Sequence, residues 1–258
     1  MCLIAFALGR HPRYRLVLVA NRDEYRSRPS DPARFWDDIP HLLAGRDRQA
    51  GGTWLGLTTG GRLAALTNYR DARQQVSDPP SRGSLVTAYL RDGSLTPARF
   101  HATLAASGSR YDGFNLLYGS LDGLHYFTNR GGSSGPVPPG IHALSNHLLD
   151  TAWPKVTAAR QRLEALLEQP DPAVADLMGC LADPAPFGDH LLPDTGIGLE
   201  RERLLSPLFI AGSTYGTRTT TLILADYDGR VTFVEQNHDL PGAPCRRFEV
   251  RMEDAGGG

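Results

Sequence analysis

The second residue of the chain is a cysteine, and it opens a short apolar run, Cys2 to Leu8, that predicts a buried strand. Because Cys2 is small, we expect methionine aminopeptidase to remove Met1 and leave Cys2 with a free α-amine. A thiol is nucleophilic, and an α-amine with a pKa of about 7.7–8.0 accepts protons near neutral pH. Cys2 is therefore a candidate nucleophile that carries its own base. The alternative is that this small side chain serves N-terminal processing alone.

The other cysteines and the histidines indicate no second reactive centre. Cys2, Cys180 and Cys245 are odd in number and far apart, which suits neither a disulfide framework nor a thiolate metal site. The eight histidines are dispersed and lack HExxH spacing, so we expect no bound metal. Motifs for dinucleotides and phosphate loops are missing too. Haem remains possible, because a single axial ligand leaves no pattern in a sequence.

The charge of the chain is nearly balanced. Its 27 basic and 28 acidic residues give a net charge of −1 and an isoelectric point near 6.7. Such a chain has no uniform attraction to nucleic acid or to anionic membranes, so we expect no nucleic-acid partner. No apolar stretch reaches the roughly 18 residues that span a bilayer, and the N-terminus lacks the layout of a secretory signal. These features predict a cytoplasmic protein without a membrane span.

Apolar, strand-forming runs occur in pairs along the chain, which predicts antiparallel hairpins. Two of the connecting turns contain the dipeptides Asp122-Gly123 and Asp228-Gly229, which favour tight connections. The expected strand pairs are 3–8 with 14–20, 53–58 with 62–67, 113–118 with 124–128, and 219–225 with 230–235.

Helices are predicted in the middle of the chain. The clearest is 152–168, where Val156, Leu163 and Leu167 form an apolar stripe opposite charged residues. Strands at both ends and helices between them favour an α+β fold of two mostly antiparallel sheets with helices outside. We expect a single domain over residues 1–258, with a flexible tail at about 252–258. Further helices are expected at 84–91, 96–106 and 171–181, and loops at 27–50, 129–141 and 183–200.

Six short motifs follow one another along this pattern, beginning with Asn21-Arg22-Asp23-Glu24. Together they resemble the NRDE family, the transport-and-Golgi-organisation-2-like proteins, from residue 2 to about 236. That family is similar in turn to N-terminal nucleophile (Ntn) hydrolases of the penicillin V acylase and bile salt hydrolase type. The resemblance implies an αββα four-layer sandwich with the nucleophile on the first strand. The other motifs are Gly51-Gly52-Thr53-Trp54-Leu55-Gly56, Leu66-Thr67-Asn68-Tyr69-Arg70, Ser81-Arg82-Gly83, Leu144-Ser145-Asn146 and Thr217-Arg218-Thr219-Thr220-Thr221.

The resemblance and the residue chemistry suggest a catalytic set of Cys2, Asp23, Asn68, Asn146 and Arg218. Asp23 would orient the Cys2 α-amine from the neighbouring strand, as the resemblance implies. Asn68 would donate to an oxyanion, and Asn146 would position the substrate or the amine. A guanidinium at Arg218 would lower the pKa of the thiol. The structural alternatives are turn formation for Asp23 and Asn68, helix capping for Asn146 and a salt bridge for Arg218.

One position departs from the bile salt hydrolase pattern. Those enzymes carry an arginine immediately before the corresponding asparagine, where this chain has Ala20. Successive strand residues point to opposite faces, so we expect Arg22 to diverge from Asp23, to pair with Glu24 and not to replace the missing arginine. The expected substrate contacts are Asn21, Arg22, Trp54 and Asn68.

Two functions fit these residues. The first is hydrolysis of a linear amide or thioester of a hydrophobic small molecule by Cys2, which requires no cofactor. The second is a non-catalytic carrier, because the resemblance implies links to haem trafficking and to acyl-CoA and lipid metabolism. The expected partner is thus a small hydrophobic anionic ligand, an acyl substrate or haem. We also expect limiting iodoacetamide to label Cys2 before Cys180 and Cys245, because cationic neighbours would enlarge its thiolate fraction.

Overall fold

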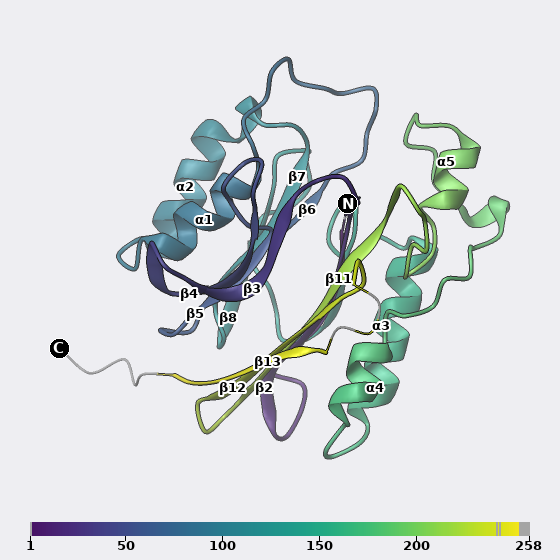
Figure 1. The fold of residues 1–258 in the computed structure, drawn as a ribbon. Coiled ribbons are helices and arrows are strands. Elements are labelled where there is room, and N and C mark those ends of the chain that lie inside the picture. Colours follow the sequence, from purple (N-terminus) through teal and green to yellow (C-terminus); the bar gives the residue numbers. More distant parts are fainter. Residues whose placement is uncertain (1, 241, 243, 253–258) are drawn as a thin grey trace.

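The computed structural model describes residues 2–240, 242 and 244–252, and these form four layers. Two antiparallel sheets pack face to face, and helices cover the outer face of each (Figure 1). The first sheet has the order β10 (Gly140–Leu144), β1 (Cys2–Leu8), β2 (Tyr14–Tyr25), β11 (Tyr215–Asp226), β12 (Arg230–Asn237) and β13 (Arg246–Arg251). The second has the order β3 (Ser30–Trp36), β4 (Ile39–Asp47), β5 (Leu55–Thr58), β6 (Arg62–Asn68), β7 (Phe114–Ser120), β8 (Gly123–Thr128) and β9 (Gly135–Pro136).

The helices divide between the two outer faces (Figure 1). Residues of α1 (Gly83–Arg91) and α2 (Pro97–Ser107) pack on the seven-stranded sheet, and those of α3 (Pro154–Leu167) and α4 (Val174–Gly179) pack on the six-stranded sheet. A short helix, α5 (Leu199–Leu204), and two 3₁₀ turns, Gly108–Arg110 and Asp189–Leu191, complete the description.

The strand β1 is apolar throughout because both of its faces are buried. Alternate residues such as Ile4 and Phe6 point between the two sheets, while Leu3 and Ala5 pack toward α3 and α4. The paired strand β2 follows the same rule, so the β1–β2 hairpin is fixed from both sides. This hairpin holds residue 2 at a defined place at one end of the sandwich.

The four expected hairpins and the αββα sandwich are confirmed. The main corrections concern segments that were expected to be loops. Residues 27–50 are not a loop, because they contain β3 and β4. Their strand signal is weak because β3 is an edge strand that carries Pro32 next to a register irregularity. The loop expected at 129–141 contains β9 and the first residues of β10, and the loop expected at 183–200 contains the first residues of α5. The helix expected at 171–181 is shorter in the structure and corresponds to α4.

At the C-terminal end, Met252 packs against the core between the sheets, and its N–H donates to the carbonyl of Gly229 at 2.8 Å. The expected flexible tail therefore does not include Met252, and its remaining residues, 253–258, lie outside the described residues. Among the residues that the structure describes, no helix is long and apolar enough to cross a membrane.

Candidate active site

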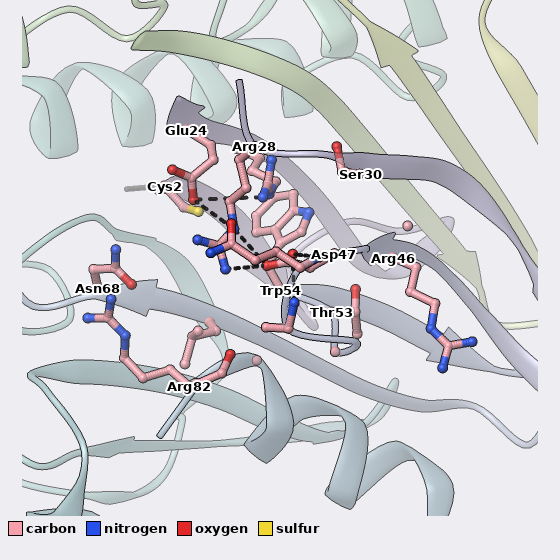
Figure 2. A pocket seen from close by; sticks show the side chains of 18 of the residues that line it. Cys2, Glu24, Arg28, Ser30, Arg46, Asp47, Thr53, Trp54, Asn68 and Arg82 are labelled. Carbon is pink, nitrogen blue, oxygen red and sulfur yellow. Dashed lines mark hydrogen bonds and ion pairs between the residues drawn. The ribbon is translucent and has the colours of Figure 1, made fainter. Parts of the chain in front are cut away.

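A pocket of about 410 Å³ lies where the start of β1 and the end of β2 meet the β3–β4 hairpin. Segments 49–54 and 79–83 complete its walls. Cys2, Arg22, Trp54 and Asn68 line it, as does Asp23. The structure therefore brings five of the residues selected from the sequence to one cavity (Figure 2).

Arg22 is the guanidinium that faces Cys2. The two residues are direct partners in the β1–β2 register, so their side chains share one face of the sheet. The Arg22 side chain is 10% exposed, and its Nη2 lies 3.8 Å from the nearest Glu24 oxygen. Its Nη1 is buried without a hydrogen-bond partner among the described residues. The side chains of Arg22 and Asp23 were expected to point to opposite faces of the strand. Because Arg22 is the partner of Cys2, it lies beside the Cys2 thiol, a position that the sequence analysis did not predict.

Burial raises the pKa of the Cys2 thiol to about 11. The Asp23 carboxylate raises this pKa too, while Arg22 and the backbone N–H of Asp23 act in the opposite direction. At neutral pH the resting thiol is therefore protonated, which is contrary to the enlarged thiolate fraction expected from the sequence. Attack by Cys2 needs a base that removes the proton during the reaction. Cys245 is the exposed thiol, so it should react first with iodoacetamide.

Asp23 is buried next to the thiol and is held on several sides. Its Oδ1 accepts a hydrogen bond from Thr217 Oγ1 at 2.7 Å, and its backbone carbonyl accepts one from the Tyr215 hydroxyl at 3.1 Å. Burial raises the pKa of Asp23, and the positive charge of Lys155 opposes that rise. Lys155 lies on α3, where its Nζ donates to the carbonyl of Leu205 at 2.9 Å. Asp23 is thus a fixed carboxylate beside Cys2.

Asn68 and Asn146 have different positions. Asn68 ends β6 and lines the pocket, and no described residue makes a hydrogen bond to its side chain, so its amide can donate to a ligand. Asn146 is buried outside the pocket wall, and its Nδ2 donates to the backbone carbonyl of Asn68 at 3.0 Å. The adjacent Ser145 hydroxyl donates to the carbonyl of Cys2 at 3.3 Å. This pair therefore ties the end of β6 to the start of β1.

Arg218 and Asn21 do not line the pocket. Arg218 is the extra residue at a register shift in β11, and its Nε pairs with Asp239 at 2.6 Å. Its Nη1 donates to the carbonyls of Tyr25 and Arg28. Asn21 is fully buried, and its Nδ2 donates to the carbonyls of two residues outside the sheet, Leu181 (3.0 Å) and Leu208 (2.9 Å). Both side chains brace the segments that surround the site.

Two further lining residues had no role in the sequence analysis. Glu235 on β12 is buried, and its Oε1 accepts the N–H of Ala33 at 2.7 Å, which links the two sheets. Burial raises the pKa of this carboxyl. Arg82 precedes α1 and belongs to the Ser81-Arg82-Gly83 motif, which was the only signal for it in the sequence.

Within residues 2–240, 242 and 244–252, no three or more His, Cys, Asp or Glu side chains gather closely enough to hold a metal ion. Among the described residues that line the pocket there is also no histidine. The arrangement offers a buried thiol, a facing guanidinium, a fixed carboxylate and a free amide, which are the groups that acyl transfer to sulfur uses.

Solved structures with the same architecture include a mutant conjugated bile acid hydrolase from Clostridium perfringens. It is 11% identical, with a TM-score of 0.51 over 98% of this chain and 94% of that chain. The fold is therefore that of the Ntn hydrolases.

Sequence comparisons are more specific. A Transport and Golgi organization 2 homolog from Mus musculus is 37% identical over 258 residues, which cover 92% of this chain and 93% of the homologue. The corresponding protein of Homo sapiens is 36% identical over 277 residues, covering 98% of this chain and 100% of that protein. The family model described as Transport and Golgi organisation 2 matches residues 1–239. The chain therefore belongs to the Transport and Golgi organisation 2 family.

Proposed function

We propose that the protein is a cysteine amidohydrolase or thioesterase whose nucleophile is Cys2 after removal of Met1. The observation that carries this proposal is the position of Cys2 in a pocket, directly opposite Arg22 and beside Asp23, with the unbonded amide of Asn68 in the same cavity. The fold supports the reaction class, because the structural neighbour from Clostridium perfringens is named a hydrolase. The substrate would be a linear amide or thioester of a small molecule.

In the acylation step, Cys2 Sγ attacks the carbonyl carbon and a C–S bond forms. The Cys2 α-amine takes the thiol proton, and the fixed Asp23 carboxylate orients this amine. The carbonyl oxygen becomes an oxyanion that the Asn68 Nδ2–H stabilises. When the intermediate collapses, the bond to the leaving amine or thiol breaks, and the ammonium group returns the proton to that leaving group.

In the deacylation step, water attacks the thioester while the Cys2 α-amine removes one of its protons. The C–S bond breaks, a carboxylic acid is released, and the thiol is restored with its proton. Arg22 would stabilise negative charge on the sulfur during attack and departure. No cofactor is needed.

The alternative is a non-catalytic carrier that binds haem, or an acyl-CoA or lipid, in the same fold. The pocket residues fit haem poorly, because no histidine is among the described lining residues and the single thiol is held in its protonated form by burial. Haem ligation by sulfur requires the thiolate. Many lining side chains are also charged, including Glu24, Asp47 and Glu235, whereas the apolar wall is limited to a few residues such as Trp54 and Leu66.

A panel of N-acyl amino acids, acyl-CoAs and haemin, assayed on wild-type protein and Cys2→Ala, separates the two functions. A hydrolase loses turnover in the variant while ligand affinity persists, because the thiol acts mainly in the chemical step. A carrier that uses Cys2 as a ligand shows no turnover, and its haemin absorption spectrum changes in the variant. Wild-type turnover that persists undiminished in Cys2→Ala would remove Cys2 from the mechanism.

A further inference from the structure

The arginines of the pocket fall into two groups according to their partners. Arg28 is neutralised by Asp47 at 2.7 Å, and Arg46 by Asp38 at 2.7 Å. Arg46 also stacks on the Trp36 ring, with its guanidinium carbon 4.0 Å from the ring centroid. Figure 2 shows the Arg46 guanidinium at the opposite end of the view from Cys2. The guanidinium groups of Arg28 and Arg46 are thus already paired with carboxylates of the protein.

Arg22 and Arg82 keep hydrogen-bond donors for a ligand. Arg22 lines the pocket with a side chain that is nine-tenths buried, and its Nη1 is buried without a hydrogen-bond partner among the described residues. Arg82 donates from Nη1 to the carbonyl of Gly113 at 2.9 Å, and no carboxylate of the described residues forms an ion pair with it. Three nearby acids could compete: Glu24 pairs with Arg22 through Nη2 at 3.8 Å, as expected from the sequence, Asp112 Oδ1 accepts the N–H of Val76, and Glu235 Oε1 accepts the N–H of Ala33. A buried donor without an acceptor is costly, so Arg22 implies an acceptor in the working protein.

The N-terminus of helix α1 opens onto the same end of the pocket. Arg82 is its N-cap residue, and the helix has no side-chain cap hydrogen bond and no acidic residue in its first turn. No acidic side chain therefore compensates its positive end, while among its first N–H groups that of Ser84 donates to the carbonyl of Ser81 at 3.2 Å. Ser81, Arg82 and Gly83 all line the pocket, and Figure 2 shows Arg82 near Asn68 and Cys2.

Two glycines allow this approach. A Cβ atom on Gly52 would lie 2.8 Å from the carbonyl carbon and oxygen of Gly83, and one on Gly83 would lie 3.0 Å from the carbonyl oxygen of Thr53. Larger side chains would push α1 away from segment 52–54. The glycines of both sequence motifs thus bring the helix N-terminus to the pocket wall.

We propose that Arg82, the N-terminus of α1 and the free Nη1 of Arg22 form a subsite for a carboxylate or phosphate group of the substrate. Charge-assisted bonds from guanidinium groups and helix N–H groups are the usual means of holding such anions. This inference rests on the proposed function in one respect, namely that the scissile carbonyl lies at Cys2. The subsite lies beside Cys2 and Asn68, so the anionic group belongs within a few bonds of that carbonyl.

Binding to the full-length Cys2→Ala protein tests the subsite without requiring turnover. We would titrate N-benzoylglycine, N-benzoyl-O-phosphoethanolamine and the neutral N-benzoylglycinamide by calorimetry. The carboxylate, the phosphate or both should bind roughly tenfold more tightly than the neutral amide, and the tighter of the two identifies the preferred anion. Anions that bind no better than the amide, or no detectable binding of any of the three, would overturn the subsite.

The substitution Arg82→Gln, made in the same background, should abolish most of the preference for the anion and leave amide binding unchanged. Arg82→Lys, which keeps the charge, should restore part of it. The matched control is Arg91→Gln, which removes one charge from the exposed end of the same helix and should change neither affinity. An equal loss of affinity for the anion and the amide in Arg82→Gln would contradict the subsite, because Arg82 would then support the pocket wall without binding the anionic group. A failed hydrolysis assay would leave these binding results intact, so the two proposals fail separately.

Discussion

Cys2 and Cys180 are two buried thiols in one chain with different surroundings. Burial raises the pKa of each to about 11, and they are 7% and 4% exposed. Cys180 lies in the apolar core between the six-stranded sheet and helices α3 and α4. Cys2 lies in a pocket, opposite Arg22 and beside Asp23. Burial alone therefore does not distinguish the two thiols, whereas the cation, the carboxylate and the Asn68 amide lie only in the pocket that Cys2 lines.

The sharpest test of this contrast is the same substitution at both thiols. Cys2→Ala should lower turnover by roughly a thousandfold or more, as removal of a nucleophile does in other acyl-transfer enzymes. Cys180→Ala should keep turnover within about twofold and cost about 1 kcal/mol of unfolding free energy, because it only removes a packed sulfur atom. Steady-state kinetics and urea unfolding of both variants measure the two effects. A similar loss of turnover in both variants would contradict the proposed difference between Cys2 and Cys180.

The second test concerns the donor that Cys180 lacks. Asn68→Ala should lower kcat by about 10²–10³-fold with a small change in KM, because the amide acts on charge that develops only in the transition state. The control is Asn129→Ala, because Asn129 does not line the pocket and donates to the backbone carbonyls of Gly108, Tyr111 and Asp112, so its loss should affect mainly stability. If kcat survives in Asn68→Ala, the oxyanion has another donor.

The smallest expected effect concerns the pH dependence of the free energy of unfolding, to which Lys155 on α3 contributes. Burial lowers the pKa of Lys155 from 10.5 to about 8. Between these two values the unfolded chain binds a proton that the folded chain does not, so Lys155 makes stability rise with pH across this window. The rise is at most about 3 kcal/mol.

Lys155→Met should remove that rise, and urea unfolding of variant and wild type at pH 8 and pH 10 would show it. The raised pKa values of Cys2 and Cys180 act in the opposite direction, since their stabilising contribution is lost as pH rises from about 9 to about 11. Both thiols are present in both proteins, so the difference between the two proteins reports Lys155 together with its charge interactions with Asp23 and Cys2. An identical pH dependence in both would show that Lys155 is not the titrating group.

The parts of the site that depend on short-range pattern could be predicted from the sequence. The β1–β2 hairpin follows from two apolar runs and a turn, and it brings Asp23 close to Cys2. Asn68 follows a strand whose apolar residues place its end beside the pocket. For Asp23 and Asn68, the position near Cys2 that was predicted from the sequence therefore agrees with the position in the structure.

The parts that depend on register could not be predicted. Whether Arg22 or Arg218 faces Cys2 is decided by the alignment of β1 on β2 and by a register shift at residue 218, and neither has a signal in the composition. The β3–β4 hairpin was missed because Pro32, Pro40 and Gly45 interrupt its apolar residues and because β3 lies at the edge of a sheet. Arg82 reaches the pocket only because Gly52 and Gly83 allow two distant segments to touch.

The central claim is that Cys2 becomes acylated through its own α-amine, and intact-mass analysis of quenched reactions tests it most directly. We would mix the protein with a slowly hydrolysed acyl thioester, quench in acid, and map the adduct by peptide mass. We expect one acyl group on a peptide that begins at Cys2, with Met1 absent and with Cys180 and Cys245 unmodified. Acylated, active protein that retains Met1, or turnover without any adduct on Cys2, would contradict it.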